Sequence, residues 1–192
     1  MEQMPAQLTP DQGRTLVELA RFTLMKRFNR KLPDSQRAEM EARLGDAALN
    51  VNSGTFVTLK IGGQLRGCIG SLEGREPLVD GVRNNAINAA FHDPRFRCLT
   101  YKELDRVTIE VSVLTTPQPL KYSDPEDLIA KLRPGIDGVT IRKGMAGSTF
   151  LPQVWEQLPD PGSFLSHLCT KAGLASDAWQ DGDLDVETYQ VQ

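Results

Sequence analysis

Residues 54–70 read Gly-Thr-Phe-Val-Thr-Leu-Lys-Ile-Gly-Gly-Gln-Leu-Arg-Gly-Cys-Ile-Gly, and this stretch predicts a β-hairpin. Residues 55–61 alternate polar and apolar side chains with the period of two that is typical of a half-buried strand. Gly62 and Gly63 follow, and paired glycines supply the positive φ angles that tight hairpin turns require. The rest of the fold is expected to pack around this hairpin.

The second arm of the hairpin carries a cysteine, Cys68, which lies between Gly67 and Gly70. Glycines at the end of a strand leave room for a neighbouring backbone or a ligand to approach closely. We therefore include Gly67 and Gly70 among the candidate ligand-binding positions.

The register of the hairpin decides which side chains share a face with Cys68. A loop of two residues would place Arg66 opposite Leu59 and so bring a charge onto the apolar face. A loop of three residues places Gly67 opposite Leu59 and keeps one face apolar and one polar. We predict the three-residue loop, and positive charge on the polar face would then favour the thiolate form of the cysteine. The predicted polar face consists of Thr58, Lys60, Arg66 and Cys68.

The chain has 192 residues, of which 40% are hydrophobic and 24% charged, an ordinary composition for a soluble domain. The net charge of −3 argues against a general nucleic-acid-binding protein, which is usually basic. No apolar run approaches the roughly 20 residues of a membrane span, and the first residues lack the pattern of a signal peptide. We expect a cytoplasmic protein without a membrane role.

Three cysteines, Cys68, Cys98 and Cys169, lie far apart in the sequence, without a CxxC pair or a Cys/His cluster. This pattern predicts neither a structural zinc site nor a disulfide framework, and it suits a reducing compartment. We predict no metal or cofactor, and we expect Cys98 and Cys169 to lie in the core.

The order of predicted elements indicates an α+β fold with a largely antiparallel sheet. A capping box at Thr9 and Gln12 marks the start of the first helix. The linker at residues 116–119 separates two halves that each contain a hairpin followed by a helix, which suggests internal duplication. The elements expected outside the first hairpin are helices over 10–31, 35–44, 77–92, 124–132 and 163–171, a second hairpin over 138–151, and strands over 107–114 and 186–191.

Four stretches resemble the AMMECR-type domain family, whose microbial members are often called AmmeMemoRadiSam system protein A. They are Leu65-Arg-Gly-Cys-Ile-Gly, Ala90-Phe-His-Asp-Pro-Arg-Phe, Glu110-Val-Ser-Val-Leu-Thr and Thr149-Phe-Leu-Pro-Gln-Val-Trp-Glu. The resemblance extends from about Leu8 to the end of the chain, and the motifs occur in the family's order and spacing.

The resemblance implies a single domain over residues 1–192, built from two unequal lobes with a cleft between them. It also implies gene neighbourhoods shared with a Memo-type protein, related in fold to non-haem iron dioxygenases, and with a radical-SAM protein. It implies no settled reaction. The family's signature carries over at Arg66, Gly67, Cys68 and Gly70.

A catalytic interpretation makes Cys68 the nucleophile, His92 its base and Glu110 the group that orients the histidine. Each residue also has a structural interpretation. Cys68 would be a small buried residue chosen for its fit between glycines. His92 would bind the last carbonyls of its helix, and Glu110 would pair with a cation on a neighbouring strand.

Several basic residues are candidates for binding a carboxylate or a phosphate, because arginine can hold such groups through two hydrogen bonds. The alternative is ion-paired or solvated surface. The segment from Asp93 to Arg95 has a structural interpretation too, in which the aspartate turns the chain and the arginine pairs back onto it. The candidate cations are Lys60, Arg66, Arg95, Arg142 and Lys143.

These observations support three functions. The first is an enzyme or enzyme subunit that uses Cys68, in the cleft between the lobes, on a small anionic metabolite. The second is a non-catalytic module that docks a Memo-type or radical-SAM protein. Nucleic-acid binding is the least supported, because the chain is acidic and lacks basic segments interleaved with aromatic residues.

Overall fold

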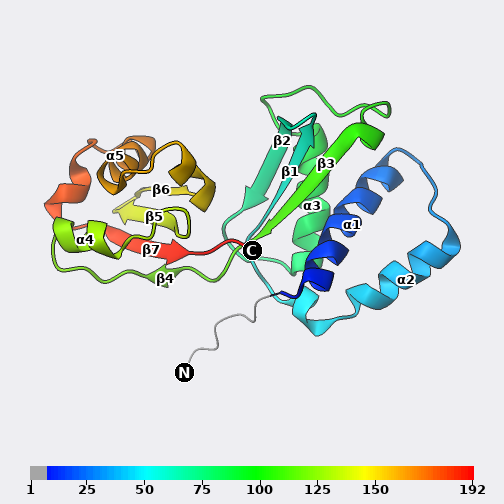
Figure 1. Ribbon diagram of the computed structural model, residues 1–192, viewed down its shortest axis with the longest axis horizontal. Helices are drawn as coiled ribbons and strands as arrows, with labels where there is room; N and C mark the ends of the chain where they lie inside the picture. Colours follow the sequence, from blue (N-terminus) through cyan, green and yellow to red (C-terminus); the bar gives the residue numbers. More distant parts are fainter. Residues whose placement is uncertain (1–7) are drawn as a thin grey trace. The chain divides into compact units, whose positions relative to one another are not determined.

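The computed structural model describes residues 8–192, which form two compact units: residues 8–114 together with Gln192, and residues 115–191 (Figure 1). Each unit has its own antiparallel sheet and its own hydrophobic cluster. The predicted α+β class is therefore confirmed, with two sheets in place of one. No helix among residues 8–192 is both long enough and apolar enough to cross a membrane.

The first unit contains a three-stranded sheet with the strand order β2-β1-β3. Helices α1 and α3 pack against each other and cover one face of this sheet (Figure 1). The elements are α1 (Pro10–Arg27), α2 (Asp34–Leu44), β1 (Thr55–Ile61), β2 (Gln64–Ser71), α3 (Leu78–Phe91) and β3 (Val107–Val113), with short 3₁₀ turns at Ala47–Asn50 and Leu104–Arg106.

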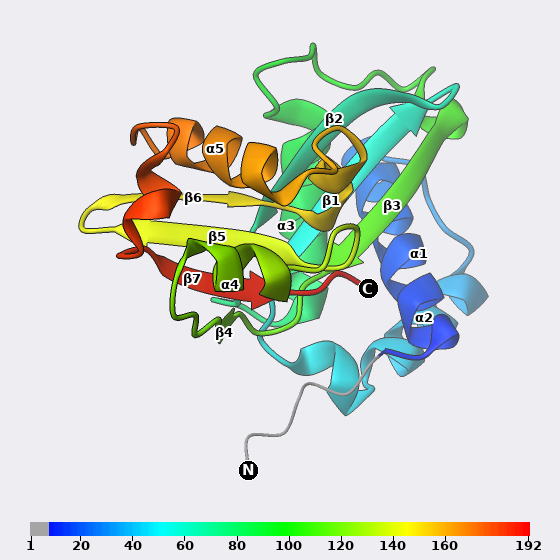
Figure 2. The same ribbon diagram turned by 60° about the vertical axis from the view of Figure 1, so that its left-hand side comes forward.

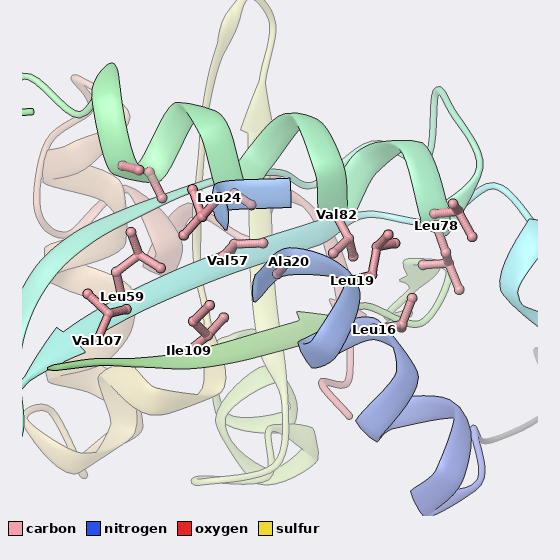
Figure 3. Close-up of a cluster of buried hydrophobic side chains, with 14 of the residues drawn as sticks. Leu16, Leu19, Ala20, Leu24, Val57, Leu59, Leu78, Val82, Val107 and Ile109 are labelled. Atoms are coloured by element: carbon pink, nitrogen blue, oxygen red, sulfur yellow. The ribbon is translucent and has the colours of Figure 1, made fainter. Parts of the chain in front are cut away.

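The core of the first unit lies between its sheet and its two packed helices (Figure 3). Val57 and Leu59 on β1 are fully buried against Leu24 of α1 and Val82 of α3. These alternate positions of β1 therefore define the apolar face of the sheet, and the side chains between them point to the opposite face.

Helix α1 begins as the sequence predicts. The Thr9 hydroxyl accepts the Gln12 N–H at 3.2 Å, and the Gln12 side chain accepts the Thr9 N–H at 2.8 Å. The helix ends at Arg27 rather than at residue 31, because Asn29 takes a φ of 56° that an α-helix cannot continue through. The predicted end of this helix, at residue 31, was therefore four residues too late.

The hairpin contains a two-residue loop, so the predicted three-residue loop is wrong. Gly62 and Gly63 have φ angles of 58° and 80°, and Ile61 pairs with Gln64 across them. A bulge at Arg66 then shifts the register by one residue. Beyond the bulge the predicted pairs, including Gly67 with Leu59, are present.

The second unit contains a four-stranded sheet with the order β4-β7-β5-β6, and α5 packs beside β6 (Figure 2). In its core the Trp155 ring stacks on Phe164 with centroids 3.7 Å apart, and the Trp155 indole N–H donates to the Asp137 carbonyl. The elements are β4 (Gln118–Pro119), α4 (Pro125–Lys131), β5 (Gly138–Lys143), β6 (Ala146–Phe150), α5 (Pro161–Lys171) and β7 (Asp185–Tyr189), with 3₁₀ turns at Pro152–Glu156 and Ala178–Asp181.

Candidate functional site

The candidate site lies on the face of the first sheet that points away from α1 and α3. Cys68 on β2 is opposite Thr58 on β1, and Thr58 is opposite Glu110 on β3, so the three residues form one row across the sheet. Lys60 lies two residues beyond Thr58 on the same side. We call these four residues, Thr58, Lys60, Cys68 and Glu110, the polar face.

The Cys68 side chain is half-buried and held in place from several directions. The Thr58 hydroxyl donates a hydrogen bond to the Cys68 sulfur at 3.2 Å. The Cys68 backbone N–H donates to the Asp93 carboxylate at 2.9 Å, and the Cys68 carbonyl accepts from the Arg95 guanidinium at 3.1 Å. Cys68 lies on an edge strand, and its N–H, its carbonyl and its sulfur each have a hydrogen-bonding partner.

Asp93 and Arg95 form the brace that holds the Cys68 backbone. The Arg95 guanidinium donates to both carboxylate oxygens of Asp93, whose side chain is only 1% exposed. The hydrogen bond from Arg95 is the largest cause that holds the pKa of Asp93 far below its usual value, and the Cys68 N–H adds to the effect. The predicted structural role of this segment, a turn closed by an arginine, is confirmed.

Arg66 does not join the polar face, which corrects the predicted arrangement. The bulge turns its side chain toward Glu103, which it contacts at 2.9 Å, and toward the carbonyls of Arg97 and Cys98. The hydrogen bond from Arg66 is the main cause that lowers the pKa of Glu103 to about 2. Arg66 thus ties the loop before β3 to the edge of the sheet.

The three candidate cations of this unit are all paired with carboxylates. Lys60 contacts Glu110 at 2.6 Å, Arg66 contacts Glu103, and Arg95 contacts Asp93. Their side chains differ in exposure: Arg95 is 55% exposed, Lys60 34% and Arg66 17%. Arg95 is therefore the cation best placed to meet an anionic group from solvent.

The other two candidate cations, Arg142 and Lys143, belong to β5 in the second unit. Lys143 bridges Asp181 and Asp183 at 3.0 and 2.9 Å.

Both signature glycines make room for groups of the protein itself. A Cβ atom at Gly67 would lie 2.0 Å from the carbonyl oxygen of Ala89, so glycine is what allows α3 to approach β2 closely. A Cβ atom at Gly70 would lie 2.3 Å from the ring of Phe56, which covers that glycine from the neighbouring strand. At both glycines, the space that we expected a ligand to use is occupied by atoms of the protein itself.

The predicted catalytic partners of Cys68 have other contacts. His92 caps the end of α3, and its ring lies 3.0 Å from the Asn88 side chain. Glu110 is separated from Cys68 by the whole of β1, two strand spacings or about 9.5 Å. Among residues 8–192 no hydrogen bond joins Cys68 to His92 or Glu110, so their roles as base and orienting group stay predictions.

The contacts of two residues in the site could not be predicted from the sequence. Glu103 holds Arg66, but nothing in the sequence pairs these residues across 37 positions. The Thr58 hydroxyl was placed on the correct face, but its bond to the thiol depends on the register after the bulge. Within the described chain, no group of three or more His, Cys, Asp and Glu residues could hold a metal ion.

The two remaining cysteines divide between surface and core. Cys169 is fully buried, as predicted, and this burial raises the pKa of its thiol. Cys98 is exposed, so its predicted core position was wrong. It lies in the loop after α3, where its thiol donates to the Phe91 carbonyl at 3.4 Å and its own carbonyl accepts from Arg66 at 3.2 Å.

Comparison with known proteins assigns the chain to a family. The family model described as AMMECR1 matches residues 17–192. The chain belongs to the AMMECR1 family. A relative from Methanothermobacter thermautotrophicus is 40% identical over 192 residues, covering 97% of this chain and 95% of that protein. Another, from Thermofilum pendens, is 40% identical over 96% of this chain and 90% of that protein.

A solved structure of the same fold supports the assignment to the AMMECR1 family. It is the crystal structure of the uncharacterized protein PH0010 from Pyrococcus horikoshii, which is 32% identical to this chain with a TM-score of 0.78. The match covers 96% of this chain and 91% of that one. The stretch Leu65-Arg-Gly-Cys-Ile-Gly lies on the edge strand β2, where Cys68 is the residue whose side chain reaches the polar face.

Proposed function

We propose that this AMMECR1-family chain is an enzyme, or the catalytic subunit of one, in which the Cys68 thiol is the nucleophile. One observation carries the proposal: a half-buried thiol accepts the Thr58 hydroxyl hydrogen bond while both backbone groups of Cys68 are held by Asp93 and Arg95. A fixed nucleophile loses little freedom on reaction, which is a large part of how enzymes lower barriers.

The neighbours of the thiol suit it to nucleophilic attack. The hydrogen bond from the Thr58 hydroxyl, at 3.2 Å, holds the sulfur in one position on the polar face. The sulfur forms a bond to an electrophilic carbon while that carbon's bond to the leaving group breaks. The thiol proton passes through water to the leaving group, so that charge and atoms balance.

The substrate class follows from the exposure of the cations. Arg95 contacts the Cys68 carbonyl and keeps more than half of its side chain exposed. A small metabolite with a carboxylate or phosphate would find in Arg95 a donor next to the nucleophile. Lys60 and Glu110, beyond Thr58, would contact the other end of the metabolite.

The three cysteines of the chain allow a test with internal controls. Native protein is treated with limiting iodoacetamide, and alkylation of each cysteine is followed by peptide mass spectrometry. We expect Cys68 to react faster than the more exposed Cys98, with buried Cys169 protected until unfolding. If Cys98 reacts faster than Cys68, the thiol is not activated and the proposal fails.

Variants in the strand next to the thiol refine the test. Thr58→Val removes the hydroxyl at nearly constant volume and should slow alkylation of Cys68, whereas Thr108→Val on β3 is the matched control. Incubation with a metabolite extract should leave an adduct on the wild type that is absent from Cys68→Ser, as measured by intact mass. Equal alkylation in the wild type and Thr58→Val would contradict the assigned role of the hydroxyl.

A second candidate is a non-catalytic module that docks the Memo-type or radical-SAM protein of its system. Leu65, within the signature, is 42% exposed beside the hairpin turn and is therefore accessible to an apolar surface of a partner. Pull-down with either partner should be lost in Leu65→Asp and retained in Met145→Asp, which changes a fully exposed residue of the second unit. Retention of the partner by Leu65→Asp would exclude this surface.

A further inference from the structure

A groove of about 800 Å³ lies between α1 and α2, within the first unit and apart from the polar face. Helix α2 diverges from α1 (Figure 1), and Met40 is the residue of α2 that is buried. The floor of the groove is apolar: Leu19 and Met40 are 4% and 5% exposed, and Phe22 and Leu44 are partly buried.

The groove is lined by one stripe of side chains from each helix. On both helices the lining residues have the spacing i, i+3, i+4, i+7, which places them on a single face. The groove between these two facing stripes is the place where a third helix would pack against both. The stripes are Leu19, Phe22, Thr23 and Lys26 on α1, and Arg37, Met40, Glu41 and Leu44 on α2.

The charges around the groove are mostly positive, with five basic and two acidic side chains among the lining residues. Arg30, Arg37 and Arg83 are paired with carboxylates. Lys26 and Lys31 have no carboxylate within 4.0 Å in the part of the chain that the structure describes. Two cations beside an apolar floor are thus available to a binding partner.

We propose that this groove docks an acidic amphipathic helix of a partner protein. Such a helix would place apolar anchors on Leu19, Phe22 and Met40 and acidic side chains toward Lys26 and Lys31. Each stripe extends over eight residues, so about 10 Å of helix, or two turns, would be in contact. A membrane surface fits less well, because its flat face cannot reach a floor recessed between two helices.

Selection from a phage-displayed library of helical peptides of about 16 residues, roughly four turns, tests the proposal. The bait is the full chain, compared with the double variant Lys26→Glu and Lys31→Glu. The control is Lys102→Glu with Lys121→Glu, which makes the same charge change at lysines away from the groove. All four lysines, Lys26, Lys31, Lys102 and Lys121, are exposed, and thermal unfolding confirms that each variant is folded.

We expect the selected peptides to carry apolar residues at i, i+3 or i+4, and i+7, with Asp and Glu beside them. Their affinity should fall about tenfold or more for the groove variant and by less than about twofold for the control, and should weaken with salt. Selection of basic or non-periodic peptides, or equal binding to the groove variant, would overturn the proposal. Sedimentation of the chain with phosphatidylserine vesicles, abolished in the groove variant, would instead assign the groove to a lipid surface.

Discussion

The carboxylate of Asp93 accepts the backbone N–H of Cys68 at 2.9 Å and so occupies a hydrogen-bonding position on the free edge of the sheet. Edge strands expose unpaired backbone groups that can pair with other chains. Here a side chain from the loop after α3 takes the place of a neighbouring strand at one residue, and it does so where the candidate nucleophile lies.

Replacement of Asp93 by asparagine should destabilise the first unit by about 2–3 kcal/mol, because it leaves Arg95 without its charged partner. The pKa of Asp93 is depressed in the folded state, so its contribution is complete above pH about 4 and is lost as the pH falls. Urea unfolding is measured between pH 6 and pH 2, roughly the range of carboxyl titration. The free energy of unfolding should fall less over this range in Asp93→Asn than in the wild type. Asp34→Asn, at an exposed pair, should retain the wild-type profile.

The contact between Arg66 and Glu103 should be measurable as a coupling energy. In a double-mutant cycle of Arg66→Met and Glu103→Gln we expect about 1–2 kcal/mol, because both side chains are largely buried and hydrogen-bonded. The exposed pair Arg14 and Asp11 should give less than about 0.5 kcal/mol. With the pKa of Glu103 lowered to about 2, the coupling should be present above pH about 4.5 and disappear as the pH falls toward 2. Equal coupling in both pairs would argue against a buried, hydrogen-bonded contact between Arg66 and Glu103.

Gly67→Ala should destabilise the chain by about 2–3 kcal/mol, because its Cβ would lie 2.0 Å from the Ala89 carbonyl and neither backbone can easily move. Gly13→Ala, at a position in α1 where an added Cβ would meet no atom beyond its own helix turn within 4 Å, should stabilise the chain by about 0.5–1 kcal/mol. Chemical denaturation measures both variants. A Gly67→Ala variant as stable as the wild type would mean that α3 and β2 do not pack as closely as described.

Burial raises the pKa of Tyr189 to about 12, although a hydrogen bond with Thr149 opposes the shift. The folded state therefore keeps this proton longer than the unfolded chain does, so Tyr189 stabilises the fold below pH about 10 and this contribution is lost as the pH rises toward 12. Burial also raises the pKa of Tyr122, so the ultraviolet titration is made in a Tyr122→Phe background, where the late tyrosinate step should be missing after Tyr189→Phe. The step should persist in Tyr101→Phe, since Tyr101 is 54% exposed. A late step that survives in Tyr189→Phe would refute the assignment.

Much of the local structure could be predicted from the sequence because it depends on neighbouring residues. The capping box at Thr9, the paired glycines of the hairpin and the alternation along β3 all act within a few positions. The length of the hairpin loop could not be predicted, because a two-residue loop with a bulge at Arg66 and a three-residue loop place the later residues in the same register.

By itself the sequence determined the α+β class and the face of the sheet on which Cys68 and Thr58 lie, and it left Asp93 and Arg95 open between a closed turn and an anion-binding site. Only the tertiary structure decided which partners each charge takes: Glu103 for Arg66, Lys60 for Glu110 and Asn88 for His92. The physical reason is that strand periodicity is a local property of the backbone. A side-chain ion pair depends on elements that are distant in sequence and meet only when the chain has folded.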